Sequence, residues 1–328
     1  AASDVYKRQI DGRILKELFR YIKYFSDEPT FKVTNEGFEL RALDPQHVYM
    51  LDLAIPIDVF DEYEVENEGY LCVDLSALNR ILRSYKKPRS KRAYPDPITL
   101  ESNGKQLKVS FQGSTSVLSI MDPYDTEFPP KPEIGPFDAE IMVNAKSLLT
   151  TIKTALEYSD VVKFESNSDQ FIVKATSDLG EYTKVFDRYE SEDLIEIESD
   201  TNVKSYYSAT ILKDLLNLKI AEAIKLNFNT DQPLQIDWLD ILGGPKATVF
   251  LAPHVGYNNY EPTTPQDQET SEDNQETAQE DFEDQKATQE FTEDLETYET
   301  QEVTEISEVS EIEETQETIP VRLVIPKE

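Results

Sequence analysis

The chain has 328 residues, with 65 Asp and Glu against 32 Lys and Arg and a formal net charge of -33 at pH 7. Its one cysteine, Cys72, excludes a disulfide framework and a multi-cysteine metal site, which is typical of a reducing compartment. No apolar run approaches the roughly 20 residues that span a bilayer, and the N-terminus lacks a signal-peptide core, so we expect a soluble, intracellular protein without membrane contact.

Residues 1–9 are set apart from the rest of the chain. Asp4-Val5-Tyr6-Lys7-Arg8-Gln9 reads like a translated sequencing adaptor fused to a truncated reading frame. We therefore interpret residues 1–9 as non-native, and a genuine strand is the alternative.

Residues 10–254 contain an internal repeat, which appears when the sequence is shifted along itself. We predict two copies of one domain, residues 10–119 and 137–254, joined by a connector at residues 120–136. The aligned pairs are Leu15 with Leu148, Ala42 with Ala175, Leu78 with Leu212 and Leu100 with Leu226.

Each predicted domain begins with an amphipathic helix and continues with alternating strands, a second helix and more strands. Asn35-Glu36-Gly37 and Asn103-Gly104 mark hairpin turns, and Asn144 is placed to cap the first helix of the second domain. The predicted fold class is α+β with mainly antiparallel sheet. The apolar positions at helical spacing in the first helix are Ile14, Leu15, Leu18, Phe19 and Ile22.

The connector contains five prolines between Met121 and Pro136, which exclude a helix or a central strand there. Beyond it, the segment 255–328 changes to a low-complexity acidic tail with 23 Asp and Glu, three Lys and Arg and a charge of -20. Its apolar residues are too sparse to offset the entropy of ordering, so we predict disorder. The apolar end, residues 319–326, is the exception, read either as a short docking segment or as an unstructured end.

Basic residues recur on the predicted helices, away from their apolar faces. A charged stripe on one helix is commonly only a solvated face, but four related helices on one surface form a cationic concavity that neutralises phosphates without reading bases. We predict a surface that binds phosphates without regard to base sequence. The predicted residues are Arg13, Lys16, Arg20, Lys23, Arg80, Arg83, Lys153, Lys213 and Lys219.

An enzyme is disfavoured by the inventory of reactive residues. His47 and His254 are the two histidines, Cys72 has no base near it in sequence, and there is no glycine-rich phosphate loop or metal-ligand cluster. We predict no catalytic residue, no metal and no cofactor.

Several motifs together resemble the proliferating cell nuclear antigen family of DNA sliding clamps, over about residues 10–254, and an archaeal member in particular. Leu43-Asp44-Pro45-Gln46-His47-Val48 resembles the family's segment after the first hairpin. Ser177-Asp178-Leu179-Gly180, Pro233-Leu234 and Phe250-Leu251-Ala252-Pro253 resemble its acidic turn, its Pro-Leu strand start and its C-terminal aromatic-Leu-Ala-Pro. The first strand is absent, and the basic insertion at residues 86–92 and the long acidic tail depart from the family.

The resemblance implies a ring of three subunits around duplex DNA, a homotrimer or a heterotrimer, in the cytoplasm with the nucleoid, or in a nucleus if the source is eukaryotic. DNA polymerase, clamp loader, flap endonuclease and DNA ligase are the implied partners. They insert a Gln-x-x-aliphatic-x-x-aromatic-aromatic peptide under the connector. The residues implied for this pocket are Leu43, His47, Met50, Ile120, Phe128, Pro233, Phe250, Leu251, Ala252 and Pro253.

Two alternatives stay open. His47 fits a turn histidine, and Phe250 and Leu251 fit the core of a terminal strand equally well. A polyacidic adaptor or DNA mimic that acts through its tail is the competing function. The tail itself is read either as an autoinhibitory segment that competes for the lysines or as a solubilising appendage.

Overall fold

The structure is a computed structural model that describes residues 12–60, 62–86, 98–123, 127–178, 180–199, 201–239, 241, 244–254 and the backbone of 320–324. Residues 1–9, most of the basic insertion, Leu179 of the acidic turn and the acidic tail up to residue 319 lie outside the described residues, and so do the expectations that concern them.

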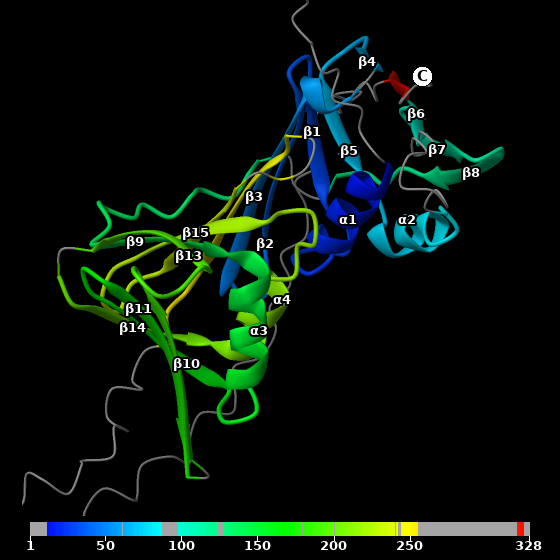
Figure 1. Ribbon diagram of the computed structural model, residues 1–328. Coiled ribbons are helices and arrows are strands. Elements are labelled where there is room, and N and C mark those ends of the chain that lie inside the picture. The colour runs from blue at the N-terminus through cyan, green and yellow to red at the C-terminus, as the bar shows by residue number, and fades with distance from the viewer. Residues whose placement is uncertain are drawn as a thin grey trace, which may run out of the picture. The chain divides into compact units, whose positions relative to one another are not determined.

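The first repeat comprises the elements from α1 to β8 (Figure 1). They are α1 (Gly12–Ile22), β1 (Thr30–Thr34), β2 (Gly37–Leu43), β3 (Tyr49–Pro56), the 3-10 turn η1 (Ile57–Val59), β4 (Glu62–Val65), β5 (Gly69–Cys72), α2 (Leu75–Leu82), β6 (Thr99–Asn103), β7 (Gln106–Phe111) and β8 (Ser114–Ser119).

The second repeat has the same order of elements, with one strand in front. It comprises β9 (Ala139–Asn144), α3 (Ala145–Ala155), β10 (Val161–Ser166), β11 (Gln170–Ser177), β12 (Gly180–Asp187), β13 (Leu194–Ser199), β14 (Val203–Ser208), α4 (Ala209–Leu215), β15 (Ala223–Phe228), β16 (Leu234–Leu239) and β17 (Lys246–Leu251). A further strand, β18 (Pro320–Val324), follows near the C-terminus.

The strands form three antiparallel sheets. The nine-stranded sheet has the order β13-β9-β15-β16-β17-β3-β2-β1-β5, the four-stranded sheet β12-β11-β10-β14 and the five-stranded sheet β4-β18-β6-β7-β8. The nine-stranded sheet crosses from one repeat to the other where β17 pairs with β3, with Phe250 opposite Met50. The α+β class with two tandem helix-and-sheet copies is thus the observed fold.

The helices form where the sequence provides an apolar face and a cap. The five apolar residues of α1 that the spacing identified are all buried. Asn144 accepts a hydrogen bond of 3.0 Å from the backbone N of Ser147, which confirms the predicted cap of α3. Asp74 and Ser208 cap α2 and α4 in the same way.

The predicted turns are present. Gly37 has φ of +135°, and a Cβ atom at this position would lie 2.1 Å from the carbonyl O of Ile55, so only glycine fits where β2 begins. At the second turn the Asn103 side chain accepts hydrogen bonds from the backbone N of Lys105 and of Gln106. Both hairpins therefore follow from local turn chemistry.

The connector carries no helix and no strand in its described part, apart from an isolated bridge between Met121 and Cys72. The domain limits 10–119 and 137–254 stay our proposal. Among the described residues, no helix is long and apolar enough to cross a membrane, and no group of His, Cys, Asp and Glu is placed to hold a metal ion.

Candidate nucleic-acid and partner-binding surfaces

Basic residues from α1, α2 and the segment after α4 surround one cavity of about 710 Å³. Two acids, Glu17 and Glu222, also line it. The structure therefore brings together residues that lie far apart in the sequence, from both repeats. The predicted DNA-binding residues in this lining are Arg13, Lys16, Arg20, Lys23, Arg83 and Lys219.

A second cavity of about 550 Å³ lies between α3 and the same segment after α4. Lys153, predicted from the sequence, and Lys146 line it, and Lys219 and Glu222 are shared with the first cavity. Because the cavities share these residues, basic side chains of the two repeats form one surface, which we call the basic surface. Arg80 on α2 and Lys213 on α4 lie outside both linings.

Arg20 is held inside the basic surface by a network of hydrogen bonds. Its guanidinium donates to both carboxylate oxygens of Glu17, and also to the carbonyl O of Asn217. Glu17 also accepts a bond of 3.1 Å from the backbone N of Lys219. Burial alone raises the pKa of Glu17, but the hydrogen bonds and charge of Arg20 outweigh it and hold that pKa below its ordinary value. Arg20 thus connects α1 to the second repeat.

The lysines of α1 are held more loosely. Lys16 Nζ lies 3.5 Å from the carbonyl O of Arg83 and from that of Tyr85, so it also joins α1 to the end of α2. Lys23 forms an ion pair of 3.1 Å with Asp27, and its side chain is 42% exposed. An exposed pair of this kind contributes little to stability, so Lys23 can exchange Asp27 for a phosphate at small cost.

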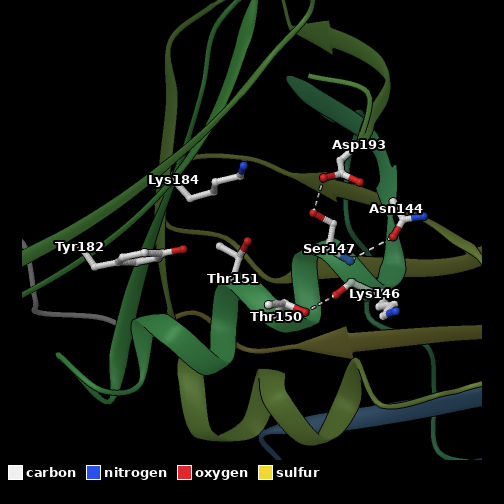
Figure 2. A pocket seen from close by; sticks show the side chains of 8 residues that line it. All are labelled: Asn144, Lys146, Ser147, Thr150, Thr151, Tyr182, Lys184 and Asp193. Atoms are coloured by element: carbon white, nitrogen blue, oxygen red, sulfur yellow. Dashed lines mark hydrogen bonds between the residues drawn. The ribbon is translucent and has the colours of Figure 1, made fainter. Parts of the chain in front are cut away.

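A third pocket, of about 380 Å³, lies between the N-terminal end of α3 and β12 (Figure 2). Ser147 donates a hydrogen bond of 2.7 Å to Asp193, and both residues line the pocket beside Asn144. Lys184 extends over it from β12, and Lys146 lies at its rim. Sequence reasoning missed Lys184 and Asp193, because neither lies on a helix or in a motif.

An apolar row crosses three strands at the predicted partner pocket. Met50 on β3 lies opposite Leu43 on β2 and opposite Phe250 on β17. Met50 and Phe250 are 3% and 9% exposed, yet neither belongs to the main core cluster. They therefore form a separate apolar patch on the sheet face opposite the core, as the alternation of strand side chains requires.

The sequence leaves Leu251 either in the partner pocket or in the core of a terminal strand, and the structure buries it fully in the main core. Successive strand residues face opposite sides, so Phe250 and Leu251 do not share one pocket. Ala252, Pro253 and Pro233 are half-buried, and the backbone N of Ala252 donates to the carbonyl O of Val48 at 2.8 Å.

His47 lies in the turn between β2 and β3, with φ of +58° and an exposed side chain. The turn is organised by Asp44, which is 3% exposed and accepts bonds from the backbone N of Gln46, Val48 and Tyr49. Both the turn reading and the contact reading of His47 fit this position. Asp44 is part of the quoted motif, but its role in holding the turn was not predicted from the sequence.

The connector is fastened to the face of β2 and β3 that lies opposite the core. Arg41 donates a hydrogen bond of 2.8 Å to the carbonyl O of Pro129 and forms an ion pair with Asp52. Its guanidinium also lies over the Phe128 ring. Lys131 pairs with the same carboxylate at 2.5 Å. Phe128 is therefore positioned two residues along β2 from Leu43, beside the apolar patch. Ile120, at the start of the connector, donates its backbone N to the carbonyl O of Lys105.

Known proteins resemble this chain over most of its described residues. Residues 6–111 match the model for the N-terminal domain of proliferating cell nuclear antigen. The DNA polymerase sliding clamp of Thermococcus gammatolerans is 32% identical over 234 residues, which are 70% of this chain and 90% of that protein. The clamp of Pyrococcus horikoshii is 31% identical over the same shares.

Solved structures show the same fold. Proliferating cell nuclear antigen from Thermococcus kodakaraensis has a TM-score of 0.67 and 26% identity, covering 74% of this chain and 97% of its own. The A. fulgidus protein, solved with the C-terminal region of FEN-1, has a TM-score of 0.66 and 24% identity, covering 75% and 97%. The relatives are archaeal, and their family is one of processivity factors rather than enzymes. The chain therefore belongs to the proliferating cell nuclear antigen family of DNA polymerase sliding clamps.

Proposed function

We propose that this clamp closes as a ring of three subunits around duplex DNA and tethers partner proteins at the apolar patch. The observation that carries the proposal is the contact between the two repeats of one chain. By element order, β17 of the second repeat corresponds to β8 of the first, and β12 corresponds to β3. Because β17 pairs with β3 inside the chain, β8 is suited to pair with β12 of the next chain.

The edges that this contact needs are open. β8 is hydrogen-bonded only to β7 and β12 only to β11 among the described strands. Val117 on β8 and Val185 on β12 are 54% and 38% exposed. Exposed apolar side chains beside an unpaired strand edge are typical of a surface that another chain covers. A head-to-tail contact of this kind generates a closed ring when its rotation closes.

The register of the proposed contact follows from the repeat. Tyr182 occupies the place of Leu51, because each pairs with the aligned alanine, Ala175 or Ala42. Leu100 pairs with Val109, which pairs in turn with Ser116. The aligned Leu226 pairs with Ile236, which pairs in turn with Val249. Ser116 therefore occupies the place of Val249. Since Val249 pairs with Leu51, Ser116 is expected opposite Tyr182, and Thr115 opposite Thr183.

The basic surface supports the DNA contact. It collects lysines and arginines from both repeats on an acidic chain. Arg80 lies in the last turn of α2, one turn before Arg83, and Lys213 lies in the last turn of α4. Phosphates attract such a surface without regard to sequence, which suits a clamp that moves along DNA. We place the nine predicted bases there, with Arg20 contributing mainly by holding the repeats together.

The apolar patch supports the partner contact. A relative's solved structure contains the C-terminal region of FEN-1, so a flap endonuclease peptide is the first candidate ligand, followed by DNA polymerase, clamp loader and DNA ligase. The peptide would place its aromatic residues between the patch and the connector at Phe128, with His47, Pro233, Ala252 and Pro253 at the rim. These assemblies would act on DNA in the cytoplasm.

The mass of the purified protein in solution tests the ring. We expect three times the monomer mass. The double variant T115K/T183K puts two like charges opposite each other at every proposed contact and should give monomers, whereas T115K/T183E restores opposite charges and should remain trimeric. Both threonines are exposed, so neither variant should unfold the chain. A monomeric wild type would contradict a homotrimeric ring, and equal masses for the two variants would contradict the proposed register. A heterotrimer would instead require a second chain for closure.

A further inference from the structure

We infer that the third pocket, between α3 and β12, binds the phosphate group of a small molecule. Its volume of about 380 Å³ lies within the range of small-molecule sites (Figure 2). Asn144, Lys146 and Thr150 of its lining also border the second cavity of the basic surface. Five residues line this pocket and neither cavity of that surface. They are Ser147, Thr151, Tyr182, Lys184 and Asp193.

Lys184 lies at a position that is apolar in the first repeat. On β12 it pairs with Val173, and on β3 Leu53 pairs with Leu40. Leu40 aligns with Val173 in the repeat. Lys184 therefore occupies the place of Leu53, which is 3% exposed, on the face of the sheet where Val173 and Phe186 are fully buried. The Lys184 ammonium lies 5.1 Å from the centroid of the Phe186 ring. A charge on the core side of a sheet is costly unless a partner binds it.

The helix that faces β12 shows the same exchange of apolar for polar residues. The alignment of the repeats assigns Thr151 to the place of Leu18 and Ser147 to the place of Ile14. Leu18 and Ile14 are 0% and 1% exposed. The second repeat thus has two hydroxyls and an ammonium around one pocket where the first repeat has core side chains. Departures of this kind from an otherwise regular pattern are typical of binding sites.

Thr151 is a buried donor that the chain itself leaves without a partner. Its side chain is 4% exposed, and Figure 2 shows its hydroxyl pointing from α3 into the pocket. The hydroxyls of Thr150 and Thr154 each donate to the carbonyl O one turn earlier. Within the described residues, the Thr151 hydroxyl forms neither this bond nor another hydrogen bond. Because an unpaired buried hydroxyl is unfavourable, this one is suited to bind a ligand.

The charges around the pocket favour an anion. Lys146 and Lys184 line it against one acid, Asp193. Asp193 already accepts a hydrogen bond from Ser147, whereas neither lysine forms an ion pair within the described part of the chain. α3 has no acid in its first turn, so its own side chains do not offset the partial positive charge at this helix end. The balance of charge is therefore positive.

A phosphate group matches the directions of the donors. Lys184 and the Tyr182 hydroxyl reach the pocket from β12, and the Thr151 hydroxyl reaches it from α3 (Figure 2). A tetrahedral phosphate offers oxygens to donors on both sides, whereas a carboxylate offers two oxygens in one plane. A duplex backbone suits the pocket less well, because a phosphate within a rigid duplex cannot approach a side chain as buried as Thr151. The ligand is therefore a small phosphate compound.

Calorimetric titration of the full chain with inorganic phosphate, in chloride buffer of constant ionic strength, tests the site. Lys184→Gln and Thr151→Val each remove one proposed donor with little change of volume. We expect Kd to rise at least about tenfold for Lys184→Gln and about threefold for Thr151→Val. Lys204→Gln on β14 and Thr154→Val on α3 change exposed side chains outside the pocket and are the matched controls, with wild-type affinity. Equal Kd values in all five proteins would overturn the inference.

Two further titrations separate the pocket from the basic surface. The variant with Lys16, Lys23, Arg80 and Arg83 replaced by Ala should keep the wild-type affinity for phosphate, and a loss of affinity would place phosphate on the basic surface and overturn the inference. A short DNA duplex should not displace phosphate from this variant. Displacement would assign the pocket to the DNA backbone and would likewise overturn it.

Urea unfolding with and without phosphate keeps the test independent of folding. Phosphate stabilises every variant by exclusion from the protein surface, but an intact pocket adds the stabilisation of a bound ligand. Thr151→Val should therefore fold normally and show a smaller phosphate-dependent shift of the urea midpoint than Thr154→Val. Equal shifts would contradict the site. The ring proposal is unaffected by either result, because all the residues of the pocket belong to one chain and the ring is tested by the mass in solution.

Discussion

The hydroxyl of Tyr21, on α1 of the first repeat, accepts a hydrogen bond of 3.1 Å from the indole Nε1 of Trp238, on β16 of the second repeat. The same hydroxyl donates to the carbonyl O of Leu215 at 2.6 Å, and the rings of Tyr21 and Trp238 meet edge to face. Burial raises the pKa of Tyr21, so the hydroxyl stays protonated as the donor that Leu215 requires. One buried phenol therefore joins the two repeats.

Tyr21→Phe should lower the free energy of unfolding by about 1–3 kcal/mol, because it leaves a buried N–H and a buried carbonyl without a partner. Urea unfolding followed by circular dichroism measures the decrease. Tyr189→Phe removes a hydroxyl from a side chain that is 80% exposed and is the matched control. Equal midpoints for the two variants would show that the hydroxyl does not stabilise the junction.

Glu17 gives the stability of the junction a dependence on pH. Its folded pKa is held below the ordinary 4.5, so its stabilisation is present above the unfolded pKa and is lost as pH falls through the folded pKa. Unfolding free energies measured from pH 6 down to pH 3 should therefore decline more steeply for wild type than for Glu17→Gln. Parallel pH profiles would show that Glu17 is not linked to folding.

Arg20 and Lys23 should separate stability from DNA binding. Arg20→Ala should cost about 1–3 kcal/mol of unfolding free energy, because it leaves the half-buried Glu17 carboxylate without its charged partner. Lys23→Ala, on the exposed side of the same helix, should leave stability within about 0.5 kcal/mol and weaken DNA binding. The reverse pattern in denaturation and DNA titration would contradict these roles.

The basic surface should set the salt dependence of DNA binding. Replacing Lys16, Lys23, Arg80 and Arg83 by Ala should weaken binding to duplexes of any sequence and reduce the slope of log affinity against log salt by about 0.9 for each phosphate that the variant no longer neutralises. Fluorescence anisotropy over a salt series measures the slope. The control replaces four lysines of the strands and turns, Lys32, Lys105, Lys204 and Lys246, and changes the net charge equally. Equal slopes for both variants would place DNA elsewhere.

The apolar patch should control peptide affinity independently of the core. Leu43→Ala with Phe250→Ala should weaken a Gln-x-x-aliphatic-x-x-aromatic-aromatic peptide by on the order of 2 kcal/mol, a roughly 30-fold rise in Kd by calorimetry, with the trimer intact. Leu251→Ala, one residue along β17, opens a cavity in the core and should cost about 2–5 kcal/mol of stability. Wild-type affinity in the double variant would refute the patch.

The acidic tail should slow association with DNA if it competes with phosphates for the basic surface. Replacing residues 258–316 by a neutral Gly/Ser linker of equal length keeps β18 and removes the charge. The on-rate on a nicked circle should rise at low salt, and the difference should fade as the Debye length falls from about 10 Å at 0.1 M to about 3 Å at 1 M. An unchanged low-salt on-rate would favour the solubilising appendage. Loss of partner binding by the linker variant would favour the polyacidic adaptor.

Local chemistry was predictable from the sequence by itself. The turn at Gly37, the cap at Asn144 and the apolar face of α1 each depend on residues a few positions apart, whose conformational preferences act within one turn or one hairpin. The repeat was also predictable, because equivalent strands keep equivalent spacing. From these came the α+β class, the two tandem domains and the set of basic residues.

Only the tertiary structure decided which neighbours those residues meet. Phe250 and Leu251 are adjacent and equally apolar, but the pairing of β17 with β3 sends one to the patch and the other to the core. Arg20 resembles its basic neighbours on α1 in sequence, yet it is Glu17 and Asn217 that surround it in the fold. Contacts between residues hundreds of positions apart depend on sheet pairing and packing, and the sequence pattern of one segment carries no record of the segment that covers it.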